Sequence, residues 1–185
     1  MKVQFMPPLR LILTNQCNGK CAFCHKEGFK NKGTMDLETM YDCANIAEEL
    51  GIPSISLTGG EPTTREDLAT IINGLQSRYS GHVCLTTNGY ALSNLHNKIS
   101  KPLHTANLSI VSFDKNVWEK YQNVVLPKAL GDLQLLSATN KNLNIVITDD
   151  NFHEIDDIIS YCIENSLSLD IMFRTKYFVR TGKTL

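Results

Sequence analysis

The sequence has 185 residues, of which 42% are hydrophobic and 20% are charged, values that are ordinary for a soluble globular domain. Its net charge of −1 creates no overall field that would attract nucleic acid or an anionic membrane, so we expect neither as a partner. One folded domain is the simplest expectation.

The amino-terminal run MKVQFMPPLRLILTNQC has only short apolar stretches and contains two prolines. It matches neither the apolar region of a signal peptide nor a span of about 20 apolar residues. We therefore expect a cytoplasmic protein. In a reducing compartment the six cysteines are not expected to form a disulfide framework, and closely spaced cysteines there more often bind metal or serve catalysis.

Apolar runs typical of strands alternate along the chain with segments of helical periodicity. The first half predicts a strand at 9–14, a helix over 37–50 that ends at Gly51, a strand at 54–58 and a helix through 68–75. Thr63 and Glu66 stand three residues apart, which is the spacing of a capping box, and they predict the start of that second helix.

The second half continues the alternation to a sixth strand. It predicts a strand at 82–87, a short helix around 92–99, a strand at 106–113, helical turns through 136, a strand at 143–148, a helix that opens with Asn151 and Glu154, and a strand at 168–173. Six such repeats with right-handed crossovers predict an α/β fold whose parallel sheet is either doubly wound or curved into part of a barrel. We assign 1–173 to this domain and 174–185 to a basic tail.

The unusual residues of the chain follow the predicted strands. Three cysteines and a histidine follow the first strand, TGGEPTT follows the second, TTNGY follows the third and SFD ends the fourth. Because ligands of parallel α/β sheets gather at the carboxyl ends of the strands, these loops predict one shared site.

The run CNGKCAFC has the C-x3-C-x2-C pattern of radical S-adenosylmethionine (SAM) enzymes, and GGEP and TTNG follow at the expected places. The chain therefore resembles that family from 9 to 173, and the resemblance implies a partial (β/α)6 TIM-like barrel. It also implies a 4Fe–4S cluster held by Cys17, Cys21 and Cys24, with one iron left open to bind SAM. The implied SAM contacts are Phe23, His25, Gly59, Gly60, Glu61, Thr87, Asn88 and Ser112.

The resemblance implies radical chemistry. An electron donor such as flavodoxin or ferredoxin would reduce the cluster, SAM would be cleaved to a 5′-deoxyadenosyl radical, and that radical would abstract hydrogen from a substrate. Glycyl-radical enzyme activation and peptide modification are alternative uses of the same chemistry, and either would bring a partner protein. A non-catalytic zinc-binding or scaffold protein is a further alternative, since three cysteines and a histidine are also zinc ligands.

Longer runs, among them LRLILTNQCNGKCAFCHKEG, TGGEPTTREDL and NIVITDDNFHEIDDII, resemble the GTP 3′,8-cyclase family of molybdenum cofactor biosynthesis. In that family an arginine at the position of Arg10 serves the nucleotide, while a solvated surface arginine is an equal alternative here. The second cysteine trio of those enzymes has no counterpart, since Cys43, Cys84 and Cys162 are scattered and are expected to be small buried residues. We expect a compact relative acting on another small molecule; a truncated cyclase or a module completed by a partner are the alternatives.

Two basic segments bear on the substrate. HKEGFKNKG contains Lys26, and the tail that follows the sixth strand begins with Arg174. Arginine and lysine pair with phosphates and carboxylates, so these segments favour a small anionic substrate such as a nucleotide. Solvated, partly mobile segments are the alternative interpretation.

Overall fold

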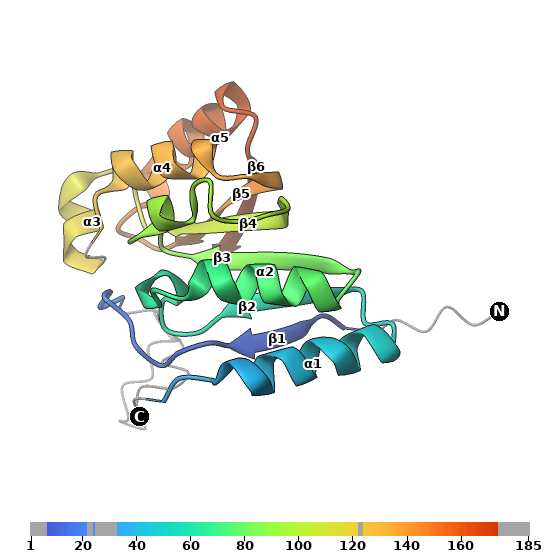
Figure 1. Ribbon diagram of the computed structural model, residues 1–185. Helices are drawn as coiled ribbons and strands as arrows, with labels where there is room; N and C mark the ends of the chain where they lie inside the picture. Colours follow the sequence, from blue (N-terminus) through green and yellow to red (C-terminus); the bar gives the residue numbers. More distant parts are fainter. Residues whose placement is uncertain (1–6, 22–23, 25–32, 122–123, 174–185) are drawn as a thin grey trace, which may run out of the picture.

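The computed structural model describes residues 7–21, 24, 33–121 and 124–173. Strands alternate with helices along almost the whole described chain (Figure 1). The elements are β1 (Leu9–Ile12), α1 (Leu37–Glu49), β2 (Ser54–Thr58), η1 (Pro62–Thr64), α2 (Leu68–Arg78), β3 (His82–Thr87), η2 (Leu92–Leu95), β4 (Leu103–Ile110), α3 (Lys115–Tyr121), α4 (Leu126–Leu135), β5 (Ala138–Ile147), η3 (Phe152–Glu154), α5 (Ile155–Glu164) and β6 (Ser168–Phe173).

The six strands form one parallel sheet in the order β1-β2-β3-β4-β5-β6. Each strand pairs with the next one along the chain, and right-handed crossovers then place all the helices on the same face. Figure 1 shows α1 and α2 against the first three strands, and α4 and α5 beside the last three. This order excludes a doubly wound sheet and confirms the open, partial-barrel α/β fold.

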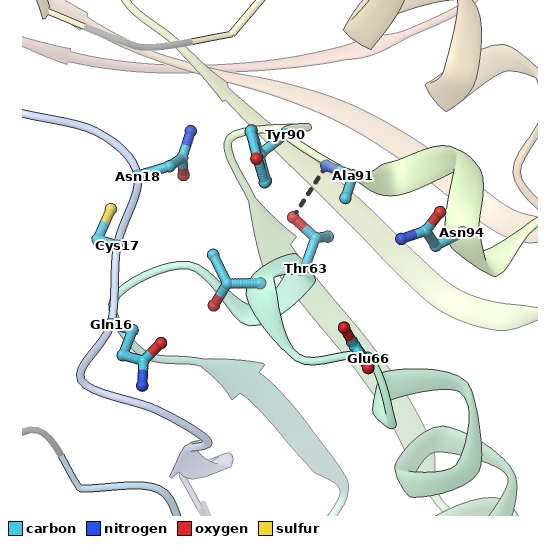
Figure 2. Close-up of a pocket in the computed structure, with 9 residues that line it drawn as sticks. Gln16, Cys17, Asn18, Thr63, Glu66, Tyr90, Ala91 and Asn94 are labelled. Atoms are coloured by element: carbon cyan, nitrogen blue, oxygen red, sulfur yellow. Dashed lines mark hydrogen bonds between the residues drawn. The ribbon is translucent and has the colours of Figure 1, made fainter.

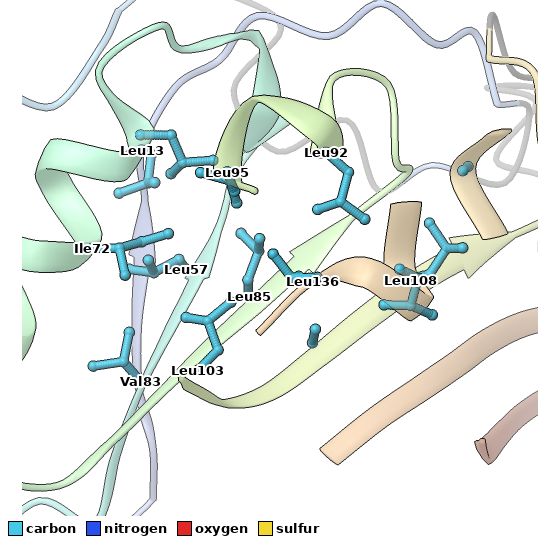
Figure 3. Close-up of a cluster of buried hydrophobic side chains, with 14 of the residues drawn as sticks. Leu13, Leu57, Ile72, Val83, Leu85, Leu92, Leu95, Leu103, Leu108 and Leu136 are labelled. Carbon is cyan, nitrogen blue, oxygen red and sulfur yellow. The ribbon is translucent and has the colours of Figure 1, made fainter. Parts of the chain in front are cut away.

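The helix-covered face of the sheet is apolar and buried. Leu57, Leu85 and Leu108 stand on three neighbouring strands, and Ile72 of α2 and Leu136 after α4 belong to the same cluster (Figure 3). Side chains alternate between the two faces of a strand, and the alternating burial of β2, β3 and β4 follows from it. Burial of this face fixes the register of the strands.

The opposite face of the sheet carries polar side chains and is only partly buried. Arg10 of β1 pairs in register with Ser56 of β2, and Arg10 is exposed. Further along the sheet, the Asn142 side-chain amide donates to Asn107 Oδ1 at 3.0 Å, and Asn107 Nδ2 donates to Thr86 Oγ1 at 3.4 Å. We call this side the uncovered face.

Helix α1 ends as the sequence predicts. Asp36 caps its amino end by accepting a hydrogen bond from Thr39 N at 2.8 Å. Gly51 follows its carboxyl end with φ of +64°, a conformation that favours glycine.

The predicted capping box at Thr63 and Glu66 is wrong. Helix α2 begins at Leu68, and Thr63 belongs to the preceding turn η1 instead. The reason is that the Thr63 N–H and hydroxyl both donate to Glu61 Oε1. The Thr63 hydroxyl also accepts a hydrogen bond from Ala91 N, so it has no free role as a helix cap.

Strands β1, β4 and β5 also differ from their predicted bounds, and β1 ends at Ile12 rather than at 14. Strand β4 ends at Ile110, because Ser112 and Phe113 bond to Glu154 rather than to a neighbouring strand. Strand β5 begins at Ala138, earlier than the apolar run, because its polar first half pairs with β4. Of the helices in the described ranges, none has the length and apolar character needed to span a membrane.

Candidate functional site

The cysteines lie on a long loop that leaves β1 and returns to α1. We call 14–34 the cysteine loop. Its two ends lie side by side, since Thr14 and Thr34 form an isolated antiparallel bridge and Asn15 N donates to Gly33 O at 3.0 Å. The loop therefore leaves and rejoins the fold at the carboxyl end of β1, and its cysteines follow that strand as the sequence predicts.

Two of the three thiols face the same small region. A methyl group added at Gly19 would lie 3.6 Å from Cys17 Sγ and 3.7 Å from Cys21 Sγ. Burial raises the pKa of the Cys17 thiol, and a hydrogen bond from Gly19 N, 3.3 Å from the sulfur, opposes that shift. Glycine at this position leaves room between the two sulfurs.

The third thiol, that of Cys24, lies at the end of a turn that begins at Cys21. Cys24 is exposed, and its N–H donates to Cys21 O at 3.1 Å. Among the residues that the structure describes, no three Cys, His, Asp or Glu side chains already converge as metal ligands. The donor set nevertheless fits an iron–sulfur cluster, because three thiols on one loop supply the usual ligands and leave a fourth position to another group.

The GGEP loop after β2 lies directly against the cysteine loop. Gly60 N donates to Thr14 O, and Glu61 N donates to Gln16 O, each at 2.7 Å. A Cβ at Gly60 would lie 2.2 Å from Gln16 O, and one at Gly59, whose φ is +147°, would lie 2.5 Å from Thr14 O. These glycines therefore allow close approach of two backbones, in addition to any role beside a ligand.

Glu61 is buried and joins the loops after β2 and β3. Its Oε1 accepts from Thr63 N, the Thr63 hydroxyl and the Thr87 hydroxyl, and its Oε2 accepts from Asn88 N at 2.7 Å. Burial raises the pKa of this carboxyl, while the hydrogen bonds from Asn88, Thr63 and Thr87 act in the opposite direction. The carboxylate thus serves as a buried cross-link.

Asn88 completes a ring of contacts among the first three loops. Its Nδ2 donates to Asn18 Oδ1 of the cysteine loop at 2.9 Å, and its Oδ1 accepts from Tyr90 N at 2.9 Å. The loops after β1, β2 and β3 are therefore each bonded to the other two, and these bonds hold the backbone around Cys17 in place.

A second set of contacts joins the loops after β4 and β5. The buried Ser112 hydroxyl donates to Glu154 Oε1, and Phe113 N donates to Glu154 Oε2, each at 2.5 Å. Asn151 strengthens the junction, since its Nδ2 donates to Val111 O at 2.5 Å and to Val146 O at 2.9 Å.

A pocket of about 420 Å³ opens beside Cys17, between the cysteine loop and the segments after β2 and β3 (Figure 2). This volume is in the range of small-molecule sites. A hydrogen bond from Ala91 N to Thr63 Oγ1 joins two of the residues that line it. Its lining is Gln16, Cys17, Asn18, Thr63, Thr64, Glu66, Tyr90, Ala91 and Asn94.

The structure brings together many of the predicted site residues but leaves several untested. Cys17, Cys21, Cys24, Gly59, Gly60, Glu61, Thr87, Asn88 and Ser112 lie on the loops at the carboxyl ends of β1 to β4. Phe23, His25, Lys26 and Arg174 lie outside the described residues. The expected SAM contacts remain predictions, and the structure adds that the Glu61, Thr87 and Ser112 side chains bond within the protein.

Sequence reasoning missed two polar residues that bond to these loops. The sequence pattern gives no role to Asn18, which stands between the cysteines, and it places Glu154 only at the start of a helix. A signal was available for Glu154, because it follows the fifth strand at the same edge of the sheet as the other loops. Of the remaining cysteines, Cys162 is buried as predicted, while Cys43 and Cys84 are only partly buried.

Relatives with assigned names share much of this chain. It is 38% identical over 165 residues to a "Probable GTP 3′,8-cyclase" of Sulfurisphaera tokodaii, covering 86% of this chain and 53% of that protein. It is 32% identical over 171 residues to a protein of the same name from Thermoplasma volcanium, covering 89% of this chain and 52% of that protein. The chain thus spans about half the length of these relatives.

Solved structures show the same fold at lower sequence identity. Streptococcus suis SuiB bound to S-adenosylmethionine has a TM-score of 0.74 and 19% identity, covering 98% of this chain and 44% of that one. SuiB bound to the precursor peptide SuiA has a TM-score of 0.71 and 21% identity, covering 91% and 39%. The family model "Radical SAM superfamily" matches residues 11–162. The chain therefore belongs to the radical SAM superfamily, whose cofactors are a 4Fe–4S cluster and S-adenosylmethionine.

Proposed function

We propose that this chain is a radical SAM enzyme that binds a 4Fe–4S cluster through Cys17, Cys21 and Cys24 and abstracts hydrogen from a small anionic substrate of the nucleotide class. When bound, the reduced cluster and SAM supply a 5′-deoxyadenosyl radical. The observation that carries the proposal is the position of the three thiols, on a loop whose backbone is bonded to the GGEP loop at Gly60 and Glu61.

The protein's own contribution is to hold these loops in place. Glu61 and Asn88 bond the first three loops together, so the cysteine loop is supported before a cluster binds. Ser112 and Glu154 fix the next edge of the site. Preorganised loops reduce the conformational freedom that is lost on binding, and they keep the reacting groups aligned.

The uncovered face is the proposed floor of the substrate site. Its Thr86, Asn107 and Asn142 side chains form a row of hydrogen-bonding groups across β3, β4 and β5. Arg10 adds an exposed positive charge on the same face. A nucleotide suits this combination, because amides recognise base edges and arginine pairs with phosphate. The names of the relatives make GTP the first substrate to test.

We further propose that a flavodoxin or ferredoxin delivers the electron. The cluster must be reachable from outside for such a donor to reduce it. Cys24 is exposed and Cys17 lines the pocket, which supports a route for the electron on this side of the described part of the cysteine loop.

Anaerobic reconstitution with iron and sulfide tests the radical generator. The reduced protein should form 5′-deoxyadenosine from SAM, and Cys17→Ala, Cys21→Ala and Cys24→Ala should each lose the cluster absorbance and at least about 100-fold of the activity, as removal of a required group does. Cys43→Ala, a cysteine on the partly buried side of α1, should retain both. SAM cleavage that survives in the three loop variants would contradict the proposal.

Isotope transfer tests the substrate. GTP deuterated in its ribose should pass deuterium into 5′-deoxyadenosine if a nucleotide is the hydrogen donor. Transfer from a peptide instead, or a stable protein radical in a partner detected by electron paramagnetic resonance, would replace the nucleotide with the peptide or activase alternative while leaving the radical generator in place.

A further inference from the structure

Arg65 lies where the two ends of the cysteine loop meet. It follows η1 in the stretch GGEPTTRED. Its Nη1 donates to Leu13 O at 2.9 Å and to Met35 O at 2.6 Å. Leu13 immediately precedes the cysteine loop and Met35 immediately follows it, so one nitrogen of Arg65 bridges both ends.

The same two ends are joined by few backbone contacts. Met35 N donates to Leu13 O at 3.1 Å, and Asn15 N donates to Gly33 O at 3.0 Å. We call this pairing of 13–15 with 33–35 the neck. The 13–15 segment is also bonded to β2 and the loop after it, since Leu13 N donates to Thr58 O at 2.9 Å and Gly60 N donates to Thr14 O at 2.7 Å. Hydrogen bonds from a charged donor to the two neck carbonyls are stronger than the neutral backbone bonds that join the same two segments.

Asp67 holds the Arg65 guanidinium in this orientation. Arg65 Nε donates to Asp67 Oδ1 at 2.8 Å, and Nη2 donates to Asp67 Oδ2 at 2.7 Å, which is a bidentate pair. The Arg65 side chain is only 12% exposed. With two of its nitrogens on the carboxylate, the planar group presents the third to the neck, an arrangement that the single nitrogen of lysine cannot reproduce.

We propose that Arg65 is a positioning residue that keeps the neck closed and so presets the cysteine loop for its cluster. A loop whose ends are already fixed loses less conformational freedom when its thiols converge on a metal centre. The closing of the neck is a property of the metal-free protein, and only its effect on the cluster rests on the proposed function.

Amide hydrogen exchange of the metal-free protein, measured by NMR, tests the neck. In Arg65→Lys the amides of Asn15 and Met35 should exchange about tenfold faster or more, the factor expected for loss of one hydrogen bond to a charged group. Amides of the β3 core, such as that of Leu85, should keep their protection. Arg78→Lys is the matched control, because Arg78 lies 4.0 Å from the centre of the Tyr41 ring and bonds to Gly74 O, away from the neck.

Asp67→Asn provides a second, milder variant, since it keeps the arginine and removes only the charge that orients it. It should speed exchange at the neck by a smaller factor, and it carries the test if Arg65→Lys does not fold. Unchanged exchange at Asn15 and Met35 would overturn the proposal, and so would an equal acceleration at the neck and in β3, which reports general destabilisation.

Iron release from the reconstituted protein tests the consequence for the cluster. Arg65→Lys should show the same electron paramagnetic resonance signal as the unaltered protein but release iron to a chelator about tenfold faster, in line with the opened neck. Equal release rates together with an open neck would disprove the link to the cluster. If the unaltered protein binds no cluster, the proposed function fails while the exchange result still decides the role of Arg65.

Discussion

The carboxylate of Glu61, in the loop after β2, accepts a hydrogen bond from the Thr87 hydroxyl at the end of β3, with 2.5 Å between the two oxygens. The same carboxylate accepts from Asn88 N and from two donors of Thr63. It is 2% exposed. Four donors therefore converge on one buried acid, which makes Glu61 the junction of two loops of the site.

Glu61→Gln should destabilise the protein by about 2 kcal/mol, because one acceptor oxygen becomes a donor that faces other donors in a buried place. Urea unfolding of the metal-free protein measures the change. Glu49→Gln, at the exposed end of α1, is the control and should lie within about 0.5 kcal/mol of the parent. An unchanged unfolding midpoint in Glu61→Gln would mean that the four hydrogen bonds do not stabilise the fold.

The strands of this fold were predictable because their faces alternate. β2 and β3 have the predicted bounds, since each combines a buried apolar side with a polar side and ends at a glycine-containing loop. The helix starts were less predictable. Thr63 and Glu66 satisfy a local capping pattern, but Thr63 bonds instead to Glu61 and to Ala91, and Ala91 lies 28 residues further along the chain.

The loops of the site were predictable, while their contacts were not. The cysteines follow β1 and GGEP follows β2, and ligands of such sheets gather at the carboxyl ends of the strands, so these loops could be assigned to one site from the sequence. The pairs Asn18–Asn88 and Ser112–Glu154 are separated by 70 and 42 residues. Only the folded sheet brings such pairs together: the sequence can indicate that Glu154 lies at the same edge of the sheet as Ser112, but not that the two side chains bond.

Gly60→Ala should disturb the cysteine loop. The added Cβ would lie 2.2 Å from Gln16 O, so the GGEP loop would move away from Thr14 and Gln16 and weaken the two backbone bonds between the loops. Overpacking of this kind costs about 1–3 kcal/mol, and the iron content after reconstitution should fall.

Gly131→Ala is the matched control, because a Cβ there meets nothing within 4 Å. That change lies inside α4 and should be neutral or stabilise the protein by up to about 1 kcal/mol. Full iron content in Gly60→Ala would show that close contact of these loops is not needed for the cluster.

Glu154→Gln should loosen the loop after β4, because Ser112 and Phe113 both donate to the Glu154 carboxylate. If this loop contacts SAM as we predict, SAM affinity should fall about tenfold, the factor for one hydrogen bond to a charged group. Calorimetry on the reconstituted protein measures it. The exposed Asp156→Asn should bind SAM normally. Loss of iron in Glu154→Gln would instead indicate a role in cluster binding.

The stacked rings of His82 and His104 predict a pH dependence of stability. Their centroids lie 3.6 Å apart, and burial, with the charge of His82 as a second cause, lowers the pKa of His104. A histidine whose pKa is lowered in the folded state binds protons more readily when unfolded, so stability falls as the pH drops below about 6.5. His104→Gln should flatten this fall, measured as the urea midpoint between pH 7.5 and 5.5. An identical slope in His104→Gln and in the unaltered protein would refute the assignment.

Asn107→Leu addresses the substrate side of the site. Asn107 bonds to Thr86 and to Asn142, so the change removes the centre of the polar row on the uncovered face. If this row binds the substrate, KM should rise about tenfold, which is the factor for one lost hydrogen bond of about 1.4 kcal/mol. SAM cleavage without substrate should keep its rate, because the change does not touch the cysteine loop. Asn116→Leu, at an exposed position of α3, is the control and should change neither quantity. An equal fall of both activities in Asn107→Leu would mean that the residue supports the fold, and an unchanged KM would move the substrate away from this face.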